Sequence, residues 1–152
     1  RLAGEEKPVL RARCAWQRFQ ADRPMYGKVF DWHTLEGPCV RKRQGVYYCF
    51  YSGGCYQGGG YGVDYGTAAH VLGPYSDAGN EQGPRVLRTV PGQVIGPGHH
   101  SLVLGPDDRS EYIVYHAWDA KMSGRRMHIN PLTWTENGPR CDLRSSGASG
   151  LS

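Results

Sequence analysis

The chain has 152 residues, which is the length of one ordinary domain and too short for two. It carries 18 Lys and Arg against 14 Asp and Glu, a formal net charge of +4, and the basic residues are scattered along the chain. With 4 Trp, 10 Tyr and 3 Phe, the composition excludes a disordered chain. No nucleic-acid-binding motif accompanies the positive charge, so we expect no nucleic-acid partner.

The two ends and the cysteines narrow the class of protein further. The start at Arg1 lacks the basic and apolar pattern of a signal peptide, and no run reaches the 18 apolar residues of a membrane span, so we expect no membrane partner. A start without Met and the small polar end SSGASGLS indicate a mature product or a piece of a longer protein. Five cysteines without a CxxC pair fit neither a disulfide framework nor a zinc site.

Glycine and proline interrupt the chain so often that only residues 9–23 and 107–123 leave room for a helix of ordinary length. Three segments, at 46–51, 61–67 and 111–116, are rich in β-branched and aromatic residues and are bounded by Gly, Pro, Asp or Ser. The segment 111–116 lies within 107–123, so this stretch is also compatible with a strand. The sequence therefore predicts an all-β fold.

A weak internal repeat links two of these strands. A shift of 64 residues places VYYCFYS, at 46–52, over SEYIVYH, at 110–116, with tyrosines in register, and places Val40 over Leu104. Repeated four-stranded units that cannot bury both faces alone are typical of propeller blades. The prediction is a partial propeller of about two blades with flanking strands.

The repeat also places two kinds of ionisable side chain at equivalent positions. Glu36 falls over His100, beside His99, and each lies just before the first strand of its unit. Because the inner strands of a propeller converge on its axis, an acid and an imidazole are expected to meet there. Neighbouring strand residues point to opposite faces, so only one of the two histidines can face the axis. The alternatives are an exposed turn glutamate and a loop histidine pair without a ligand.

Six motifs stand in a fixed order along the chain: DWHTLEGP at 31–38, VYYCFYSGG at 46–54, LGPY at 72–75, GPGHHS at 96–101, YIVYHAWD at 112–119 and PLTWTENGP at 131–139. In this order, over about residues 16–139, the chain resembles the C-terminal half of glycoside hydrolase family 43. The resemblance implies a five-bladed β-propeller whose members cleave arabinose- and xylose-containing glycans with inversion. Residues 1–152 are then the C-terminal part of that domain, with 143–152 expected to be a flexible tail.

The resemblance implies that Glu36 is the general acid, because the catalytic glutamate of the family stands in an E-G-P motif. Expulsion of an alkoxide from the anomeric carbon is prohibitive near neutral pH. A carboxylic acid must therefore protonate the glycosidic oxygen.

Inversion also needs a base carboxylate about 6.5–9.5 Å from the acid, with water between them. The family takes its base, and a second aspartate that tunes the acid, from earlier blades. Asp22 and Asp31 are the only aspartates before Glu36, and both lie too close to it in sequence. We therefore expect this chain to be inactive alone and to need the missing N-terminal blades. The alternative is a non-catalytic, carbohydrate-binding propeller remnant. In both cases the partner expected is a plant-type oligo- or polysaccharide.

Three further residues are assigned to substrate binding, His99 and Arg125 by the resemblance and Trp32 by its place near the expected pocket. His99 matches the central histidine that orients the catalytic aspartates and contacts an axial calcium through water in some members. Arg125 matches the arginine of a G-R motif that contacts substrate, although Arg126 competes for the role and a solvated hairpin arginine is the alternative. Trp32 lies near the expected pocket, where an aromatic ring can stack on a sugar or simply pack. No cofactor is required, and no dedicated metal site is predicted; calcium enters only through His99.

Other residues near this region are left without a role or assigned to packing. Tyr56 and Tyr61 share the alternatives of Trp32, and His33 stays undecided. Asp64, in the middle of a predicted strand, is interpreted as part of a solvated face and not as the missing base. The remaining tryptophans, Trp16, Trp118 and Trp134, are assigned to packing between strands or blades.

Overall fold

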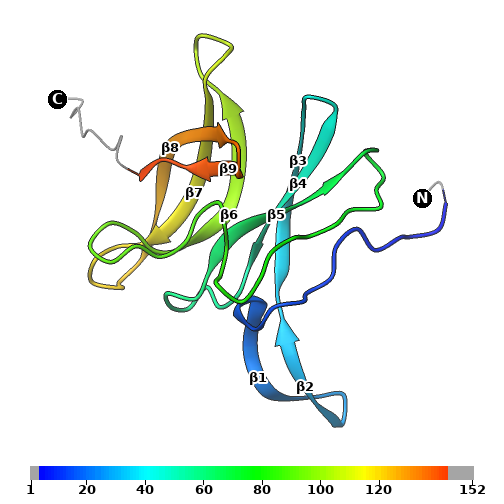
Figure 1. Cartoon of the computed structure of the whole chain (residues 1–152). Coiled ribbons are helices and arrows are strands. Elements are labelled where there is room, and N and C mark those ends of the chain that lie inside the picture. Colours follow the sequence, from blue (N-terminus) through cyan, green and yellow to red (C-terminus); the bar gives the residue numbers. More distant parts are fainter. Residues whose placement is uncertain (1–3, 144–152) are drawn as a thin grey trace.

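The computed structural model of the chain describes residues 4–143. Its regular elements there are nine strands and one short 3-10 turn, Ala15–Gln17, so the all-β prediction is confirmed (Figure 1). The strands are β1 Arg18–Met25, β2 Lys28–His33, β3 Leu35–Arg43, β4 Val46–Gly53, β5 Gly62–Ala68, β6 Ile95–Leu104, β7 Glu111–Trp118, β8 Arg125–Thr135 and β9 Gly138–Cys141.

The strands form three antiparallel sheets in chain order. They are the hairpin β1-β2, the three-stranded sheet β3-β4-β5 and the four-stranded sheet β6-β7-β8-β9. The two larger sheets lie side by side, and the hairpin extends beyond them at one end (Figure 1). The loop after β5 supplies part of a fourth strand, because it forms isolated bridges from Leu87 to Val63 and from Ser76 to Thr67. Two blade-like units with a flanking hairpin therefore fit the predicted partial propeller.

The internal repeat is real, but its offset changes within the unit. β4 and β7 are related by the predicted shift, whereas β3 and β6 are not. Glu36 pairs with Ser52, and the β7 equivalent of Ser52, His116, pairs with Gly98. Gly98, and not His100, is therefore the counterpart of Glu36, an offset of 62 positions. The difference arises because the loop between β6 and β7 is longer than the two-residue turn between β3 and β4.

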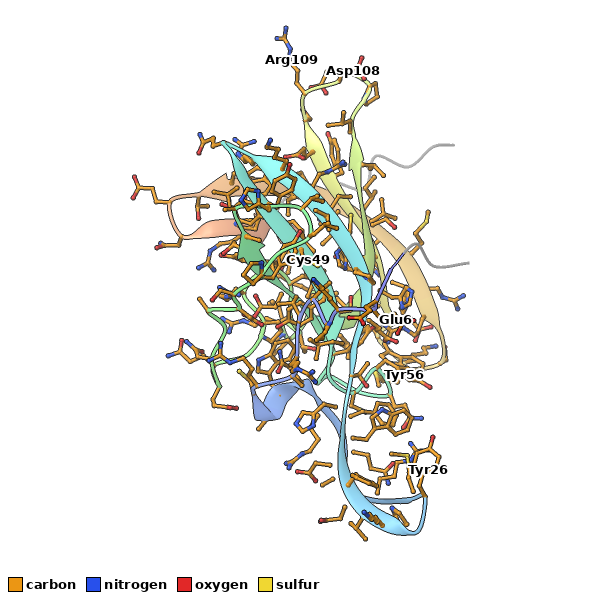
Figure 2. All side chains as sticks on the ribbon, turned by 90° about the vertical axis from the view of Figure 1, so that its right-hand side faces the viewer. Glu6, Tyr26, Cys49, Tyr56, Asp108 and Arg109 are labelled. Atoms are coloured by element: carbon orange, nitrogen blue, oxygen red, sulfur yellow. The ribbon has the colours of Figure 1, made fainter. Side chains whose placement is uncertain are left out.

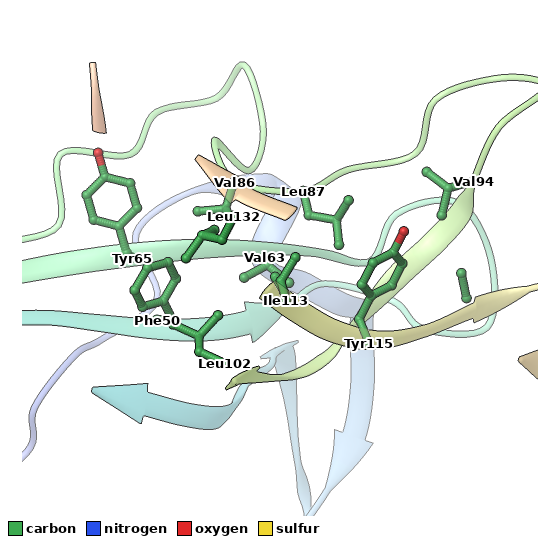
Figure 3. Packing of buried hydrophobic residues seen from close by; sticks show 11 residues of the cluster. Phe50, Val63, Tyr65, Val86, Leu87, Val94, Leu102, Ile113, Tyr115 and Leu132 are labelled. Carbon is green, nitrogen blue, oxygen red and sulfur yellow. The ribbon is translucent and has the colours of Figure 1, made fainter. Parts of the chain in front are cut away.

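The hydrophobic core lies between the two larger sheets (Figure 3). Phe50 of β4 and Val63 of β5 face Ile113 of β7, and all three side chains are fully buried. Val86, Leu87 and Val94 of the long loop close the remaining side. Burying each such side chain contributes about 1.5–3 kcal/mol, so this layer holds the two sheets at a fixed angle. The positions of residues at the ends of β3 and β6 follow from it.

Trp134 confirms the expectation that its ring packs between strands. Its ring lies 4.8 Å from that of Tyr48 and 6.2 Å from that of Phe50, centroid to centroid. Trp16 stacks on Tyr51 with 6.3 Å between ring centroids.

Several apolar side chains stay outside the core. Met127 and Ile129 of β8 are 81% and 57% exposed on the outer face of the four-stranded sheet. Tyr26 projects from the tip of the β1-β2 hairpin, at the opposite end of the molecule from Asp108 and Arg109 (Figure 2). The tail expected at 143–152 falls, apart from Leu143, outside the described residues. In residues 4–143, no helix has the length and apolar character needed to cross a bilayer.

Candidate active site

Glu36 lies in β3, opposite Ser52 of β4, immediately before an irregularity in the β3-β4 ladder. The next residue, Gly37, has a φ of +58°, a left-handed conformation that suits glycine. The bulge ends the regular alternation of β3 and lets the carboxylate of Glu36 turn toward the neighbouring sheet. Its side chain is 39% exposed, so the carboxylate is within reach of a ligand.

His99 lies at the matching bulge in β6. Its φ is +49°, although it is not a glycine, and its backbone N–H donates to the Oγ of Ser52 at 2.8 Å. The side chain is 57% exposed, and its Nδ1 lies 3.9 Å from Oε1 of Glu36. The expected meeting of an acid and an imidazole from two blade-like units is therefore present in the geometry.

Tyr61 holds the carboxylate in place. Its hydroxyl donates to Oε1 of Glu36 at 2.5 Å, and the tyrosine itself is almost completely buried. Burial, and then the nearby Glu36 carboxylate, raise the pKa of the Tyr61 phenol well above its ordinary value. The phenol therefore remains a hydrogen-bond donor across the physiological pH range. A buried ring of this kind is not available for stacking on a sugar, which was one interpretation of this residue.

Arg125 lies behind the site and not at its surface. Its Nη1 donates to the carbonyl of Tyr56 at 2.9 Å, and its Nη2 donates to those of Gly96 and His116 at 2.6 Å and 2.9 Å. Its Nε donates to Nδ1 of His116. The adjacent Arg126 is exposed and only approaches Asp119, at 3.5 Å. Arg125 is thus the inward-facing arginine of the pair, but most of its donors are already used.

His116 joins this group without having been identified from the sequence as a site residue. Its ring stacks on that of His99, with 5.9 Å between centroids and 17° between planes. It also stacks on Tyr61, at 6.4 Å and 18°. Because strand residues 114, 116 and 118 share one face of β7, the strand prediction places His116 on that face. Only the packing of the sheets shows that the face meets Glu36.

Trp32 lines a groove of about 810 Å³ that begins at Glu36 and runs along the β1-β2 hairpin. Phe19, Arg23 and Tyr56 also line it. The guanidinium of Arg23 lies 3.7 Å from the centre of the Trp32 ring, and the ring of Phe19 lies 4.9 Å from it. Trp32 is therefore near the acid, as expected, but a sugar must displace Arg23 before it can stack on that face.

The sequence matches a known family over most of its length. The model of the family described as glycosyl hydrolases family 43 covers residues 13–139. The chain belongs to this family.

Solved structures of family 43 have the same fold. A thermostable family-43 glycoside hydrolase superimposes with a TM-score of 0.72 at 26% identity, over 91% of this chain and 42% of that chain. An alpha-L-arabinanase of Cellvibrio cellulosa, complexed with arabinohexaose, gives 0.60 at 29% identity, over 72% and 37%.

A curated relative is the beta-D-galactofuranosidase xynD of Aspergillus niger, 38% identical over 84 residues, which are 54% of this chain and 23% of that protein. The chain thus spans less than half the length of these family-43 relatives.

His100, the other histidine of the family-43 GPGHHS motif, faces the core. It is buried beside Phe50, and its Nδ1 lies 3.2 Å from the Oγ of Ser52. Burial lowers its pKa to about 4, so the ring is neutral near pH 7. Of the two histidines, only His99 lies beside Glu36, which agrees with the expectation that one of them faces the axis and with the choice of His99 from the resemblance.

The interpretation of Asp64 as part of a solvated face is wrong. Asp64 is fully buried in β5 and its Oδ1 accepts from Nε of Arg85 at 2.7 Å, while Nη2 of Arg85 donates to Asp77 at 2.9 Å. Burial raises the pKa of Asp64 to about 6, against the opposing effect of Arg85. The loop that follows β5 covers this strand. The alternation of side chains along a strand does not show whether a loop buries its outer face. This ion pair anchors the loop and belongs to no open site.

The residues around His99 do not form a calcium site by themselves. Calcium takes six to eight oxygen ligands, whereas the groups that surround His99 are one carboxylate, one phenol and another imidazole. In the part of the chain that the structure describes, no cluster of three or more His, Cys, Asp and Glu side chains is placed to hold a metal ion. Contact between His99 and calcium through water stays a prediction.

Proposed function

We propose that Glu36 is the general acid of an inverting glycosidase, and that this chain supplies the acid side of its site. The observation that carries the proposal is the placement of one carboxylate between Tyr61 and His99. Its Oε1 accepts from the phenol at 2.5 Å and lies 3.9 Å from the imidazole, while the side chain keeps access to the groove. An acid that must reach a glycosidic oxygen needs this combination of fixed position and access.

The base of the same reaction belongs, in this proposal, to blades outside this chain. Asp31, one of the two aspartates that precede Glu36, is held by Arg18 at 2.9 Å on the β1-β2 hairpin. Asp64 is buried in its ion pair with Arg85. A complete propeller would place the base carboxylate about 6.5–9.5 Å from Glu36, with the attacking water between the two carboxyl groups.

The substrates proposed are arabinose- or xylose-containing glycans. An arabinanase of Cellvibrio cellulosa and a xylan beta-1,4-xylosidase of Bacillus halodurans share this fold. The 38% identity to a galactofuranosidase makes a galactofuranoside the second substrate to be tried. The groove beside Glu36 has aromatic and cationic walls, which suit the faces and hydroxyls of a sugar chain.

The test uses a single polypeptide in which the N-terminal blades of a family-43 enzyme precede this chain. Glu36→Gln is expected to lower kcat/KM by about 10²–10⁴ on pentosides with alkyl leaving groups, which need protonation. On dinitrophenyl pentosides, whose leaving group departs as an anion, the loss is expected to be much smaller. Glu136→Gln, on the exposed β8-β9 turn, is the matched control and should leave both rates unchanged.

Two outcomes would contradict the assignment. Equal losses on alkyl and dinitrophenyl substrates would give Glu36 a structural role. A folded fusion protein that binds pentose oligosaccharides without turnover, with or without Glu36, would instead establish the alternative of a carbohydrate-binding remnant.

A further inference from the structure

We propose that Arg125 fixes His116 as the neutral imidazole with its proton on Nε2, and that this N–H is a permanent hydrogen-bond donor to substrate beside Glu36. His116 is then a substrate-binding residue, and Arg125 is a positioning residue that acts through it. The identity of the acceptor, a hydroxyl oxygen of the sugar, rests on the proposed function. The state of the ring does not.

The chemistry of arginine determines the tautomer. A guanidinium has five N–H donors and no acceptor, so the Nδ1 that receives Nε of Arg125 must carry a lone pair. A neutral imidazole with a bare Nδ1 has its proton on Nε2. Protonation of Nδ1 would place two N–H groups head to head and would break this hydrogen bond.

The guanidinium has little freedom to leave. Its two terminal nitrogens donate to the carbonyls of Tyr56, Gly96 and His116, and it lies about midway between two aromatic rings, 5.5 Å from the centre of Tyr61 and 5.4 Å from that of Trp118. Breaking the hydrogen bond from Nε to His116 would require the whole side chain to turn, which would also break the hydrogen bonds to these carbonyl oxygens. The contact to His116 is therefore built into the fold.

The groups that face the His116 ring favour the same state. The guanidinium of Arg125 and the ring of His99 both disfavour a charged His116, Tyr61 stays neutral, and Glu36 is the acid that opposes them. Burial and then Arg125 lower the pKa of His116, and Glu36 only partly opposes them. The geometry of the hydrogen bond and the surrounding charges thus agree.

The second ring nitrogen of His116 is free to bind a substrate in this proposal. In residues 4–143 no protein group accepts a hydrogen bond from its Nε2, and the ring is only half-buried. Stacking on His99, which lies beside the Glu36 carboxylate, fixes the plane of the ring. A neutral donor held in one plane suits an uncharged sugar hydroxyl, because it adds direction without adding charge.

The direct test is the tautomer of His116 in the chain itself, measured by long-range ¹H–¹⁵N correlation on histidine-labelled protein and assigned by the loss of its signals in His116→Asn. We expect a protonated Nε2 and a bare Nδ1 in the parent protein. Arg125→Met should give the averaged tautomers of a free imidazole, whereas Arg126→Met, which removes the neighbouring exposed arginine, should change nothing. Methyl spectra of both variants check that the fold is retained.

An Nδ1–H tautomer in the parent, or an unchanged His116 signal in a folded Arg125→Met, would overturn the proposal. A second readout uses the complete propeller. His116→Gln places an amide donor near the position of Nε2 and should raise KM less than His116→Asn, which is expected to raise it about tenfold with kcat nearly unchanged. Equal KM values would contradict the binding role. An inactive propeller would count against the proposed function alone, because the tautomer needs no turnover.

Discussion

The strands β3 and β6 have a bulge at equivalent positions, but glycine and the polar residue stand in reverse order in the two bulges. In β3, Glu36 is followed by Gly37, with a φ of +58°. In β6, Gly98 takes the position of Glu36, and His99 takes that of Gly37, with a φ of +49°. The repeat thus supplies one backbone shape twice, and the exchange of glycine and functional residue between two successive positions makes the site asymmetric.

Each glycine of this pair leaves space for a partner from the other sheet. A side chain at Gly98 would overlap the ring carbons of Tyr61, whose hydroxyl supports Glu36. A side chain at Gly37 would lie 3.7 Å from the ring of His99, in ordinary contact. The space at Gly98 is therefore occupied by the ring of Tyr61, whereas a small side chain at Gly37 would fit in ordinary contact with His99. A positive φ at a non-glycine residue is uncommon outside turns, and His99 adopts it at the bulge that brings its ring beside Glu36.

The largest effect of breaking this arrangement is expected at Gly98. Gly98→Ala forces a Cβ into the ring of Tyr61, which is held by the core, and should lower the free energy of unfolding by about 3 kcal/mol. Gly58→Ala is the control, because its Cβ would meet nothing within 4 Å. Urea unfolding of both variants measures the difference. A loss at Gly98 no greater than at Gly58 would mean that Tyr61 moves freely, and its role in holding Glu36 would fail.

The next effect concerns the third position of the bulge, where β3 has Pro38 and β6 has the buried His100. The pKa of His100 is about 4 in the folded chain and ordinary, near 6.5, in the unfolded one. Between these values the unfolded state binds more protons, so His100 makes the fold less stable as the pH falls. Between pH 7 and pH 5, His100 is expected to lower the free energy of unfolding by about 2 kcal/mol.

Asp64 works in the opposite direction, since a raised carboxyl pKa favours the folded state as the pH falls from about 6 toward its ordinary value. The net pH dependence of the parent therefore hides the effect of His100. The measurement is the difference between parent and His100→Leu in urea unfolding at pH 7 and pH 5. The variant should gain about 2 kcal/mol on the parent at the lower pH. An unchanged difference would mean that His100 has access to water and protons.

Local sequence was sufficient for much of the fold. The β-branched and aromatic segments predicted strands that became β4, β5 and β7, and the repeat predicted two related units. The offset of β3 against β6 could not be obtained from a constant shift, because the connecting turns differ in length. The burial of Asp64 could not be predicted either, because it is covered by the loop 69–94, which has no regular hydrophobic pattern.

The site was predictable only where a motif marked it. Glu36 and His99 stand in short motifs with glycine and proline, and the structure brings them together as expected. Tyr61 directly precedes β5 and His116 lies in β7, where aromatic and imidazole side chains are ordinary core residues. Tyr61 meets Glu36 on the side of the three-stranded sheet, and His116 meets Arg125 within the four-stranded sheet. The contacts that join these two pairs, Tyr61 with His116 and Glu36 with His99, depend on the angle between the two sheets. Arg125 was found by its motif, but the carbonyls that hold it come from the loop before β5, from β6 and from β7, so its position behind the site was not predictable.

The smallest effect sharpens the comparison between the two bulges. Gly37→Ala places an ordinary residue at a φ of +58° without a clash, so only backbone strain remains, and the expected loss of stability is about 1 kcal/mol. Gly27→Ala, at +73° in the open β1-β2 turn, should lose a similar amount and is the matched control. Gly37→Asn should lose less, because asparagine tolerates the left-handed region. A loss of stability in Gly37→Ala as large as that in Gly98→Ala would show that the bulge in β3 is also tightly packed against a partner. The two bulges would then not differ in packing.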